Sequence, residues 1–307
     1  MPSHDPPELQ IPSKAGPGYL SPDYVRALGQ TPLAFGRTGG HLVARPIGAS
    51  RLLDLAGPYP IFCCEDWSAL HAAVAEIEPG PVCLTLVSDP FAPLDHAGLA
   101  KIFPVCRRIH DHWVIDLCRP LAPSRHHLRT LKIVGPITID TGPADPALGT
   151  EWARLYANLV DRKGIRDSRA FSAESLAAQL GIPGAHTVVS RAEDTLLGVD
   201  LYYIVGRTAF AHLSAYSPEG YRRSVSYAMT VAACDYLKPL ADYFDQGGAP
   251  SGAAGQGIAA FKSGWTDLAM PSYLCGKVLD LAAYARLAPE ADPFGFFPAY
   301  RAGEFTR

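Results

Sequence analysis

The first half of the chain alternates short apolar runs with segments of helical periodicity. Apolar runs of strand length occupy residues 60–64, 82–87 and 113–118. Between them, residues 67–77 and 94–103 predict helices, the first with its apolar residues recurring every three or four positions so that they share one face. Strands joined through helices are typical of crossover connections, so we expect a largely parallel sheet in this region.

A similar unit begins in the second half. A strand is predicted at 134–140, followed by an amphipathic helix at 148–163 that Gly164 is placed to cap. A shorter helix follows at 172–180, and Ser172 is its expected N-cap.

The apolar period then becomes two, which is typical of antiparallel strands. Strands are predicted at 186–190, 195–205 and 208–216, with Gly206-Arg207 as a two-residue turn between the last two. Strict alternation puts Asp200 on one face of this hairpin. The other face is expected to carry Tyr203, Phe210, His212, Ser214 and Tyr216.

The last third of the chain returns to alternating elements. We expect a helix at 221–237, a short strand at 243–245 and a loop of small residues at 247–257. A helix at 258–265 and a final strand at 271–279 complete the pattern.

Composition and charge limit the classes of function. The chain has 307 residues, 48% hydrophobic and 19% charged, which fits a packed globular protein of one large or two ordinary domains. The net charge of -3 provides no overall basic field for non-specific nucleic-acid binding. No apolar run approaches the roughly 18 residues of a membrane span. The polar, proline-rich start lacks the pattern of an export signal, so we expect a cytoplasmic protein.

The cysteines and histidines do not form a metal-binding pattern. Seven cysteines lie mostly in apolar contexts without C-x-x-C spacing, so we interpret them as buried reduced thiols. His110 and His112 flank Asp111, but no cysteine or carboxylate motif at ligand spacing accompanies them. We therefore expect no metal, and we place both histidines in solvent on a turn before the strand at 113–118.

The segment 119–132 is the clearest basic stretch, because it contains no acidic residue. Arg125, Arg129 and Lys132 can bind a phosphorylated or nucleotide-linked acceptor, or tRNA. A solvated linker between two units explains the same composition, and the sequence leaves both interpretations open.

The element order from residue 134 onward resembles the GNAT acyltransferase fold. In that fold an acyl donor lies in the wedge between the fourth and fifth strands, which correspond to 208–216 and 243–245 here. The intervening helix at 221–237 directs its N-terminal amides at the donor's phosphates. The resemblance implies a donor-binding set of Ser214, Tyr216, Gly220, Arg222, Arg223 and Ser224. The loop 217–224 departs from the usual pattern because it has one glycine instead of two, so an ordinary capped loop is the alternative.

The chain more closely resembles the double-GNAT, Fem-like branch, over about residues 55–300. Its most specific part is the string from Phe244 to Gly248, followed by a helix that bears Phe261 and Lys262. The basic segment 119–132 resembles the arginine-rich stretch that precedes the second half of these proteins. The helical coiled-coil arm of Fem-type enzymes is absent from the pattern, which disfavours a peptidoglycan bridge enzyme.

This resemblance implies an α/β fold with a mixed sheet, in which two GNAT-like halves follow one another. The expected organisation is an irregular N-terminal arm at 1–30 and a degenerate GNAT-like half at 31–133. The half at 134–307 is then the one that carries the transfer chemistry.

Acyl transfer to an amine needs proton removal, stabilisation of the carbonyl oxygen and a positioned donor. We predict that Lys262 supplies the stabilising charge, and that His212 and Asp245 are the candidates for proton removal. A solvated lysine, a core histidine and an acid that braces the glycine loop are the respective alternatives. The remaining expected site residues are Gly247, Gly248 and Phe261 for the donor, and Arg125, Arg129, Tyr202 and Tyr203 for the acceptor.

Three functions are compatible with these residues and with the resemblance. The first is an N-acyltransferase that moves an acyl group from acyl-coenzyme A to an amine of a small molecule, sugar or peptide, without a covalent enzyme intermediate. The second is a Fem-like transferase that uses aminoacyl-tRNA in cell-wall or natural-product biosynthesis. The third is a binding protein with a decayed site. The sequence has no G-x-S-x-G elbow, which argues against a serine hydrolase. We expect a monomer or homodimer that does not bind DNA.

Overall fold

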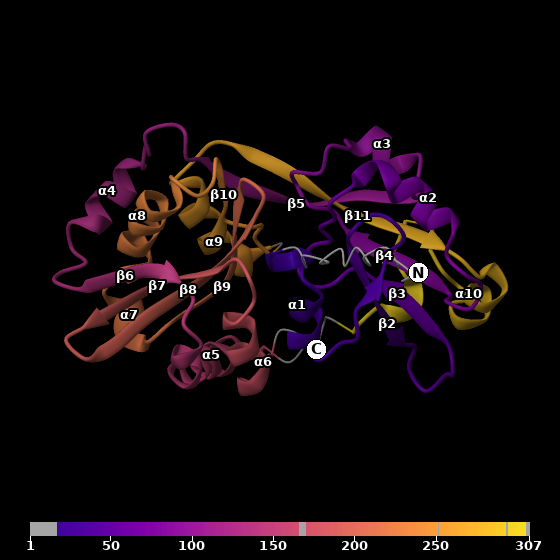
Figure 1. Cartoon of the computed structure of the whole chain (residues 1–307), viewed down its shortest axis with the longest axis horizontal. Coiled ribbons are helices and arrows are strands. Elements are labelled where there is room, and N and C mark those ends of the chain that lie inside the picture. The colour runs from indigo at the N-terminus through magenta and orange to yellow at the C-terminus, as the bar shows by residue number, and fades with distance from the viewer. Residues whose placement is uncertain (1–16, 166–169, 251, 293, 305–307) are drawn as a thin grey trace, which may run out of the picture.

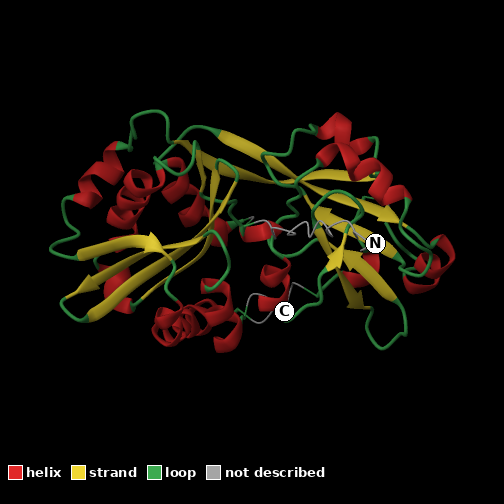
Figure 2. Ribbon diagram, in the orientation of Figure 1, coloured by secondary structure: helices red, strands yellow, loops and turns green. Residues whose placement is uncertain are grey.

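The computed structural model describes residues 17–165, 170–250, 252–292 and 294–304. Within them the chain forms one eleven-stranded sheet that arches across the molecule, with helices on both faces (Figures 1 and 2). The sheet has the order β1-β2-β3-β4-β11-β5-β10-β9-β8-β7-β6. The strands are β1 (Leu33–Ala34), β2 (His41–Pro46), β3 (Leu53–Ala56), β4 (Cys83–Val87), β5 (Val105–Asp116), β6 (Thr138–Pro143), β7 (Ala185–Ala192), β8 (Thr195–Val205), β9 (Thr208–Tyr216), β10 (Tyr243–Asp245) and β11 (Ala269–Val278).

The sheet is mixed, as expected, but its first half is not largely parallel. In the described sheet the parallel pairs are β3–β4 and β10–β9, and the other neighbours run antiparallel. The prediction of a parallel first half is wrong because β11, from the end of the chain, lies between β4 and β5. Sequence order alone would make β4 and β5 neighbours.

The helices cover both faces of the sheet (Figure 2). Residues of α1, α5 and α6 share one hydrophobic core with β8 and β9, while α8 and α9 cover the opposite face. Residues of α2 and α3 pack on the other end of the sheet. The helices are α1 (Pro22–Ala27), α2 (Leu70–Ala75), α3 (His96–Ala100), α4 (Arg125–Leu131), α5 (Gly149–Lys163), α6 (Ala173–Leu180), α7 (Pro218–Arg222), α8 (Val225–Leu237), α9 (Ala253–Ser263) and α10 (Leu281–Leu287).

The amphipathic helix and its caps are confirmed. α5 buries Trp152, Leu155 and Tyr156 on one face. It ends at Gly164, whose φ of 62° lies in the left-handed region that glycine adopts without strain. Ser172 accepts a hydrogen bond from the amide of Ser175 and so caps α6.

Several local elements differ from expectation. The apolar run at 60–64 contributes a single bridge, Phe62 to Ser88, instead of a strand. The basic stretch contains α4, which Ser124 caps, and α9 starts within the expected loop of small residues. The described part of the N-terminal arm is also helical. Its α1 lies below the arch of the sheet (Figure 1).

β5 is longer than predicted, and this changes the environment of two histidines. It runs through Val105–Asp116, so His110 and His112 lie within the strand and not on a turn in solvent. Residues two apart on a strand point to the same face. His112 is 8% exposed and pairs with Met270 of β11. The interpretation of these histidines as solvated is therefore wrong.

A bulge changes the phase of the hairpin formed by β8 and β9. The turn is as predicted, with Val205 opposite Thr208, but the register shifts between Leu201 and Tyr202. Beyond the bulge, one extra residue moves later side chains to the opposite face. Tyr203, Phe210 and His212 share a face as expected, whereas Tyr216 lies beside Asp200 on the other. Ser214 also hydrogen-bonds Asp200, so both predictions for that face are corrected.

The helix expected at 221–237 is divided in two. α7 and α8 meet at Ser224, whose φ of 55° is left-handed and interrupts the helical hydrogen bonds. Gly220 in α7 packs on β8 so closely that a Cβ would lie 2.2 Å from the Leu197 carbonyl oxygen. The close approach that this glycine permits is therefore to the protein's own sheet.

Candidate active site

β9 and β10 start side by side and then part. They pair in parallel up to Asp245, which lies opposite Phe210. The next residue, Gln246, donates its amide to the carbonyl of Trp113 on β5 at 2.9 Å, while β9 continues to Tyr216. The predicted divergence of the two strands therefore begins at Asp245.

A histidine and a carboxylate form a pair at this point. Asp245 is 2% exposed, and its Oδ2 lies 2.7 Å from Nδ1 of His112. Its Oδ1 accepts the amide of Gly247 at 2.7 Å. An ionised carboxylate only accepts hydrogen bonds, so Nδ1 carries the hydrogen and Nε2 keeps the lone pair. Asp245 thus fixes the orientation and tautomer of a histidine that the sequence interpretation placed in solvent.

Lys262 reaches the same region from α9. Its Nζ donates to the carbonyl of Gly248 at 2.5 Å. Burial lowers the pKa of Lys262 to about 8, and the charge of Asp245 acts in the opposite direction. The left-handed backbone of Gly247, with φ of 76°, turns the loop towards this ammonium group. The structure therefore brings Lys262, Asp245, Gly247 and Gly248 together, as the resemblance implies.

His110 packs directly against the glycine loop. A Cβ at Gly248 would lie 3.0 Å from Cβ of His110, so a side chain at this position would crowd the histidine. Burial lowers the pKa of His110, and the neighbouring His112 and Lys262 lower it further. His110 is therefore neutral near pH 7 and lies beside the cationic group.

Asp89 extends the cluster from the first half of the chain. It follows β4, and one of its oxygens accepts the amide of Phe91 while the other lies 3.6 Å from Sγ of Cys63. Burial, with a contribution from the charge of Asp245, raises the pKa of Asp89 to about 6. Burial likewise raises the pKa of Cys63 well above its usual value, so this thiol is not a nucleophile.

His212 lies in a separate hydrogen-bonded group under the hairpin. Its Nδ1 is 3.1 Å from the hydroxyl of Tyr19, and its Nε2 is 2.7 Å from Oε1 of Gln179. Burial lowers the pKa of His212 to about 3. Tyr203, an expected acceptor contact, stacks at a tilt on this ring and donates its hydroxyl to the Gln179 carbonyl. Both ring nitrogens of His212 are therefore occupied by the arm and α6.

Two of the expected donor contacts surround a buried carboxylate on the other face. Asp200 is 4% exposed and accepts hydrogen bonds from the hydroxyls of Tyr202, Ser214 and Tyr216. Burial raises the pKa of Asp200, while the three hydroxyls lower it. Tyr202 was predicted to contact the acceptor, but it belongs to this group below α8.

The arginines of the expected phosphate loop are engaged with other parts of the chain. Arg222 forms an ion pair with Glu219 in α7. Arg223 donates to the carbonyls of Val134 and Pro136 and thereby holds the segment that leads into β6. The structure thus places both side chains in contacts within the protein.

The remaining predicted residues lie on the α4 side. Arg125 and Arg129 are exposed on α4. Phe261 packs with His127 and Trp265, away from the glycine loop that its neighbour Lys262 contacts. α4 is tied to the end of α9, because Ser124 donates its amide to Gly264 and the His127 ring contacts the Phe261 carbonyl.

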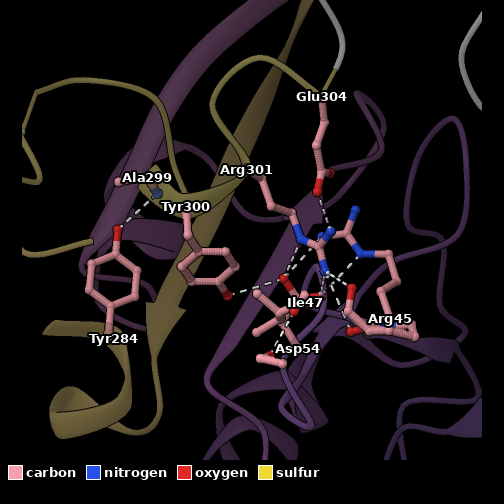
Figure 3. A network of polar contacts seen from close by, with 10 residues as sticks. Arg45, Ile47, Asp54, Tyr284, Ala299, Tyr300, Arg301 and Glu304 are labelled. Atoms are coloured by element: carbon pink, nitrogen blue, oxygen red, sulfur yellow. Dashed lines mark hydrogen bonds and ion pairs between the residues drawn. The ribbon is translucent and has the colours of Figure 1, made fainter. Parts of the chain in front are cut away.

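A cavity of about 1090 Å³ adjoins the site on the side of β2–β4. His110 lines one part of it, and Arg45 and Arg301 line another. Figure 3 shows these two arginines converging on Asp54, which is 0% exposed. No sequence pattern predicted this space, because β2 and β3, the strands that form its far wall, carry no clear strand signal.

Across the described ranges, no group of three or more His, Cys, Asp or Glu side chains lies close enough to hold a metal ion. A search of the same residues finds no helix with the length and apolarity needed to cross a bilayer.

The architecture matches several solved structures. FemX superposes with a TM-score of 0.61 at 14% identity, covering 86% of this chain and 92% of that one. L-PGS from Bacillus licheniformis gives 0.59 at 14%, covering 88% and 91%. The C-terminal DUF2156 domain of a proposed lysylphosphatidylglycerol synthetase from Agrobacterium fabrum gives 0.59 at 15%, covering 87% and 89%. The chain shares the fold of FemX and of the two L-PGS-type structures. No family model and no curated protein sequence matches it, so the likeness is one of fold.

Proposed function

We propose that this protein transfers an acyl group to an amine at the site formed by His112, Asp245 and Lys262. The observation that carries the proposal is the grouping of these side chains where β9 and β10 diverge. A histidine held in one tautomer and a buried cation supply the base and the charge that the reaction requires. The Fem-like fold supports the reaction class.

The reaction is a direct displacement. The amine attacks the carbonyl carbon, the new C–N bond forms, and the bond between the carbonyl carbon and the leaving group breaks. Nε2 of His112 removes the proton of the attacking nitrogen, and Asp245 stabilises the imidazolium that results. The leaving group departs with the electron pair and receives the proton from the imidazolium of His112, which regenerates the base. Lys262 stabilises the oxygen that becomes negative, and its burial strengthens that interaction.

His112 is a better candidate for the base than His212. Both nitrogens of His212 are hydrogen-bonded, and its pKa of about 3 makes it a poor proton acceptor near neutral pH. We therefore assign His212 to positioning the arm through Tyr19, and proton removal to the pair of His112 and Asp245.

The first candidate donor is an acyl-coenzyme A. Its thioester carbonyl would lie in the wedge beyond Asp245, where β9 no longer has β10 beside it. The second candidate is an aminoacyl-tRNA. Two observations favour it: Arg223 is engaged within the protein, and Arg125 and Arg129 are exposed on α4.

Stability and transfer assays with both donors test the proposal. Purified protein is mixed with acetyl-coenzyme A or with aminoacyl-tRNA, and the melting temperature is measured at two salt concentrations. A donor that binds only the native state raises that temperature, and the increase with tRNA should decline steeply with salt. Transfer to a panel of primary amines is followed by mass spectrometry.

Matched variants connect the transfer to this site. His112→Gln and Lys262→Met should abolish most of the transfer, whereas Lys238→Met, which changes an exposed lysine after α8, should not. Wild-type rates in both site variants would exclude these residues from the chemistry. Absence of binding and of transfer with both donors would refute the proposed function.

A further inference from the structure

The cavity beside the site is long and crosses most of one half of the sheet. Its lining takes residues from each of five neighbouring strands, β5, β11, β4, β3 and β2. His110 belongs to β5 and Arg45 to β2, which are four strand spacings apart. At about 4.8 Å per spacing, these two residues are about 19 Å apart across the sheet.

The walls between these ends are apolar. Val43 of β2, Ala56 of β3 and Thr85 of β4 are aligned in register and form one row of the floor. Thr85 carries a buried hydroxyl oxygen without a hydrogen-bond partner among the described residues. Aromatic side chains face this row from other segments of the chain, namely Tyr59, Phe171, Phe296 and Phe297. Apolar walls of this length suit a narrow, extended molecule.

The end at His110 leads to the proposed reaction site. His110 packs on Gly248, and the carbonyl of Gly248 accepts a hydrogen bond from Nζ of Lys262. His112, the proposed base, is two residues further along the same strand and faces the same side. His110 thus connects this end of the cavity to the strand that carries His112 and to the loop that Lys262 contacts.

The other end carries two arginines and two acids. Arg45 and Arg301 line the cavity there together with Glu304, and Asp54 accepts hydrogen bonds from both guanidinium groups. Arg301 is fully engaged, because its three nitrogens bond Asp54, Glu304 and carbonyls of β2. Arg45 is half-buried and binds Asp54 through Nε and Nη2 (Figure 3). In the described part of the chain, no hydrogen bond involves its third nitrogen, Nη1.

We infer that this cavity binds the acceptor of the transfer reaction, and that the acceptor is an extended amino carboxylate. Its primary amine lies at His110, its apolar chain lies along the row of Val43, Ala56 and Thr85, and its carboxylate meets Arg45. This identification of the acceptor rests on the proposed function, whereas binding of the compound to the cavity does not.

Direct binding measurements test the cavity assignment separately from the proposed function. Unbranched ω-amino carboxylates of increasing length, and the alkylamines of matching length, are titrated into the full-length protein by calorimetry. Affinity for the amino carboxylates should rise with length up to a span near that of the cavity and should exceed the affinity for the matching alkylamine. A charge-assisted hydrogen bond corresponds to about a tenfold to hundredfold preference.

Variants locate the two ends. Arg45→Gln should remove the preference for the carboxylate and leave alkylamine binding unchanged, whereas Arg51→Gln, on the exposed loop between β2 and β3, should change neither. Ala56→Phe should weaken the binding of long amino carboxylates and leave the binding of short ones unchanged. The melting temperature of this variant shows whether it folds. In transfer assays Arg45→Gln should raise the KM for long amino carboxylates with little change in kcat.

Each outcome decides one claim. Equal binding of both series, or a preference that persists in Arg45→Gln, overturns the inference. Transfer to other amines without binding of any amino carboxylate also overturns it while the proposed function stands. Binding that depends on Arg45 and Ala56, without transfer to any amine, supports the cavity assignment and refutes the proposed function.

Discussion

Replacing Lys262 by methionine should make the protein more stable and less active. Burial lowers the pKa of Lys262 from 10.5 to about 8, which means that the folded protein disfavours the charged form. At 1.36 kcal/mol per pH unit, the shift corresponds to about 3 kcal/mol. Because Lys262 is half-buried and donates to Gly248, we expect about 1–3 kcal/mol to be recovered when the charge is removed.

The gain should depend on pH. Between pH 8 and about 10.4 the unfolded chain binds more protons at Lys262 than the folded protein does, so wild-type stability rises across this window. The full cost of burying the charge is present below pH 8. A methionine side chain has no charge to lose, and Lys262→Met should therefore gain about 1–3 kcal/mol at pH 7 and almost nothing at pH 10.5.

Urea unfolding at the two pH values, followed by tryptophan fluorescence, measures this difference. Lys238→Met, at an exposed position, is the control and should change stability by less than about 0.5 kcal/mol at both. The same preparations are assayed for transfer, where Lys262→Met should lose about a hundredfold or more. A loss of stability at pH 7, or an equal change at both pH values, would refute the assignment of Lys262 as a buried cation.

Three further substitutions test other parts of the site. His112→Gln should lower kcat/KM for transfer by about 10²–10⁴-fold, whereas His212→Gln should leave kcat/KM nearly unchanged and lower the free energy of unfolding by about 1–3 kcal/mol. Asp89→Asn should raise the free energy of unfolding by about 1–3 kcal/mol above pH 6 and by little at pH 4. The reason is that burial raises the pKa of Asp89 to about 6, so the wild-type protein loses stability as the pH rises from about 4 to 6; equal changes in urea unfolding at both pH values would contradict this. Gly264→Ala should cost about 1–3 kcal/mol in urea unfolding, since its Cβ would lie 1.9 Å from the His127 ring; an unchanged midpoint would show that the ring moves aside.

Sequence patterns predicted the elements that carry Asp245 and Lys262. The strand predicted at 243–245 matches β10, which ends at Asp245. The glycines after it predicted the loop that leads to the helix with Lys262, which is α9. These features depend on local signals, namely a short apolar strand and glycines that permit a tight turn. The resemblance to Fem-like proteins then supplied the fold, which the structure confirms.

His112 was missed for a reason that lies outside local sequence. The polar string from Arg107 to His112 does not have the composition of a strand, yet it lies in β5 because β11 pairs with it, while β10 pairs with the residues that follow, Val114 to Asp116. Those partners come more than 120 residues later in the chain. The signal that was available is the spacing of His110 and His112, which puts both on one face if the strand is extended by a few residues.

The hairpin shows a second limit. Alternation predicts the face of Phe210 and Tyr203 correctly, but a bulge near Leu201 reverses the phase for Ser214 and Tyr216. No residue in this stretch signals the bulge, because neither glycine nor proline lies at it. Ser214 and Tyr216 are two of the donor contacts that the resemblance implied, and the structure places both beside Asp200.

The position of β5 explains how the site is assembled from distant parts of the chain. Its first part pairs with β11, and its last residues, Val114 to Asp116, pair with β10. His112 pairs with Met270 of β11, and its side chain contacts Asp245 of β10, so the proposed base contacts the strands on both sides of β5. A base and a carboxylate on adjacent strands of one continuous sheet keep their separation without a moving segment. The sheet therefore sets the distance between the base and the carboxylate. The shape of the acceptor determines only how it enters through the neighbouring cavity.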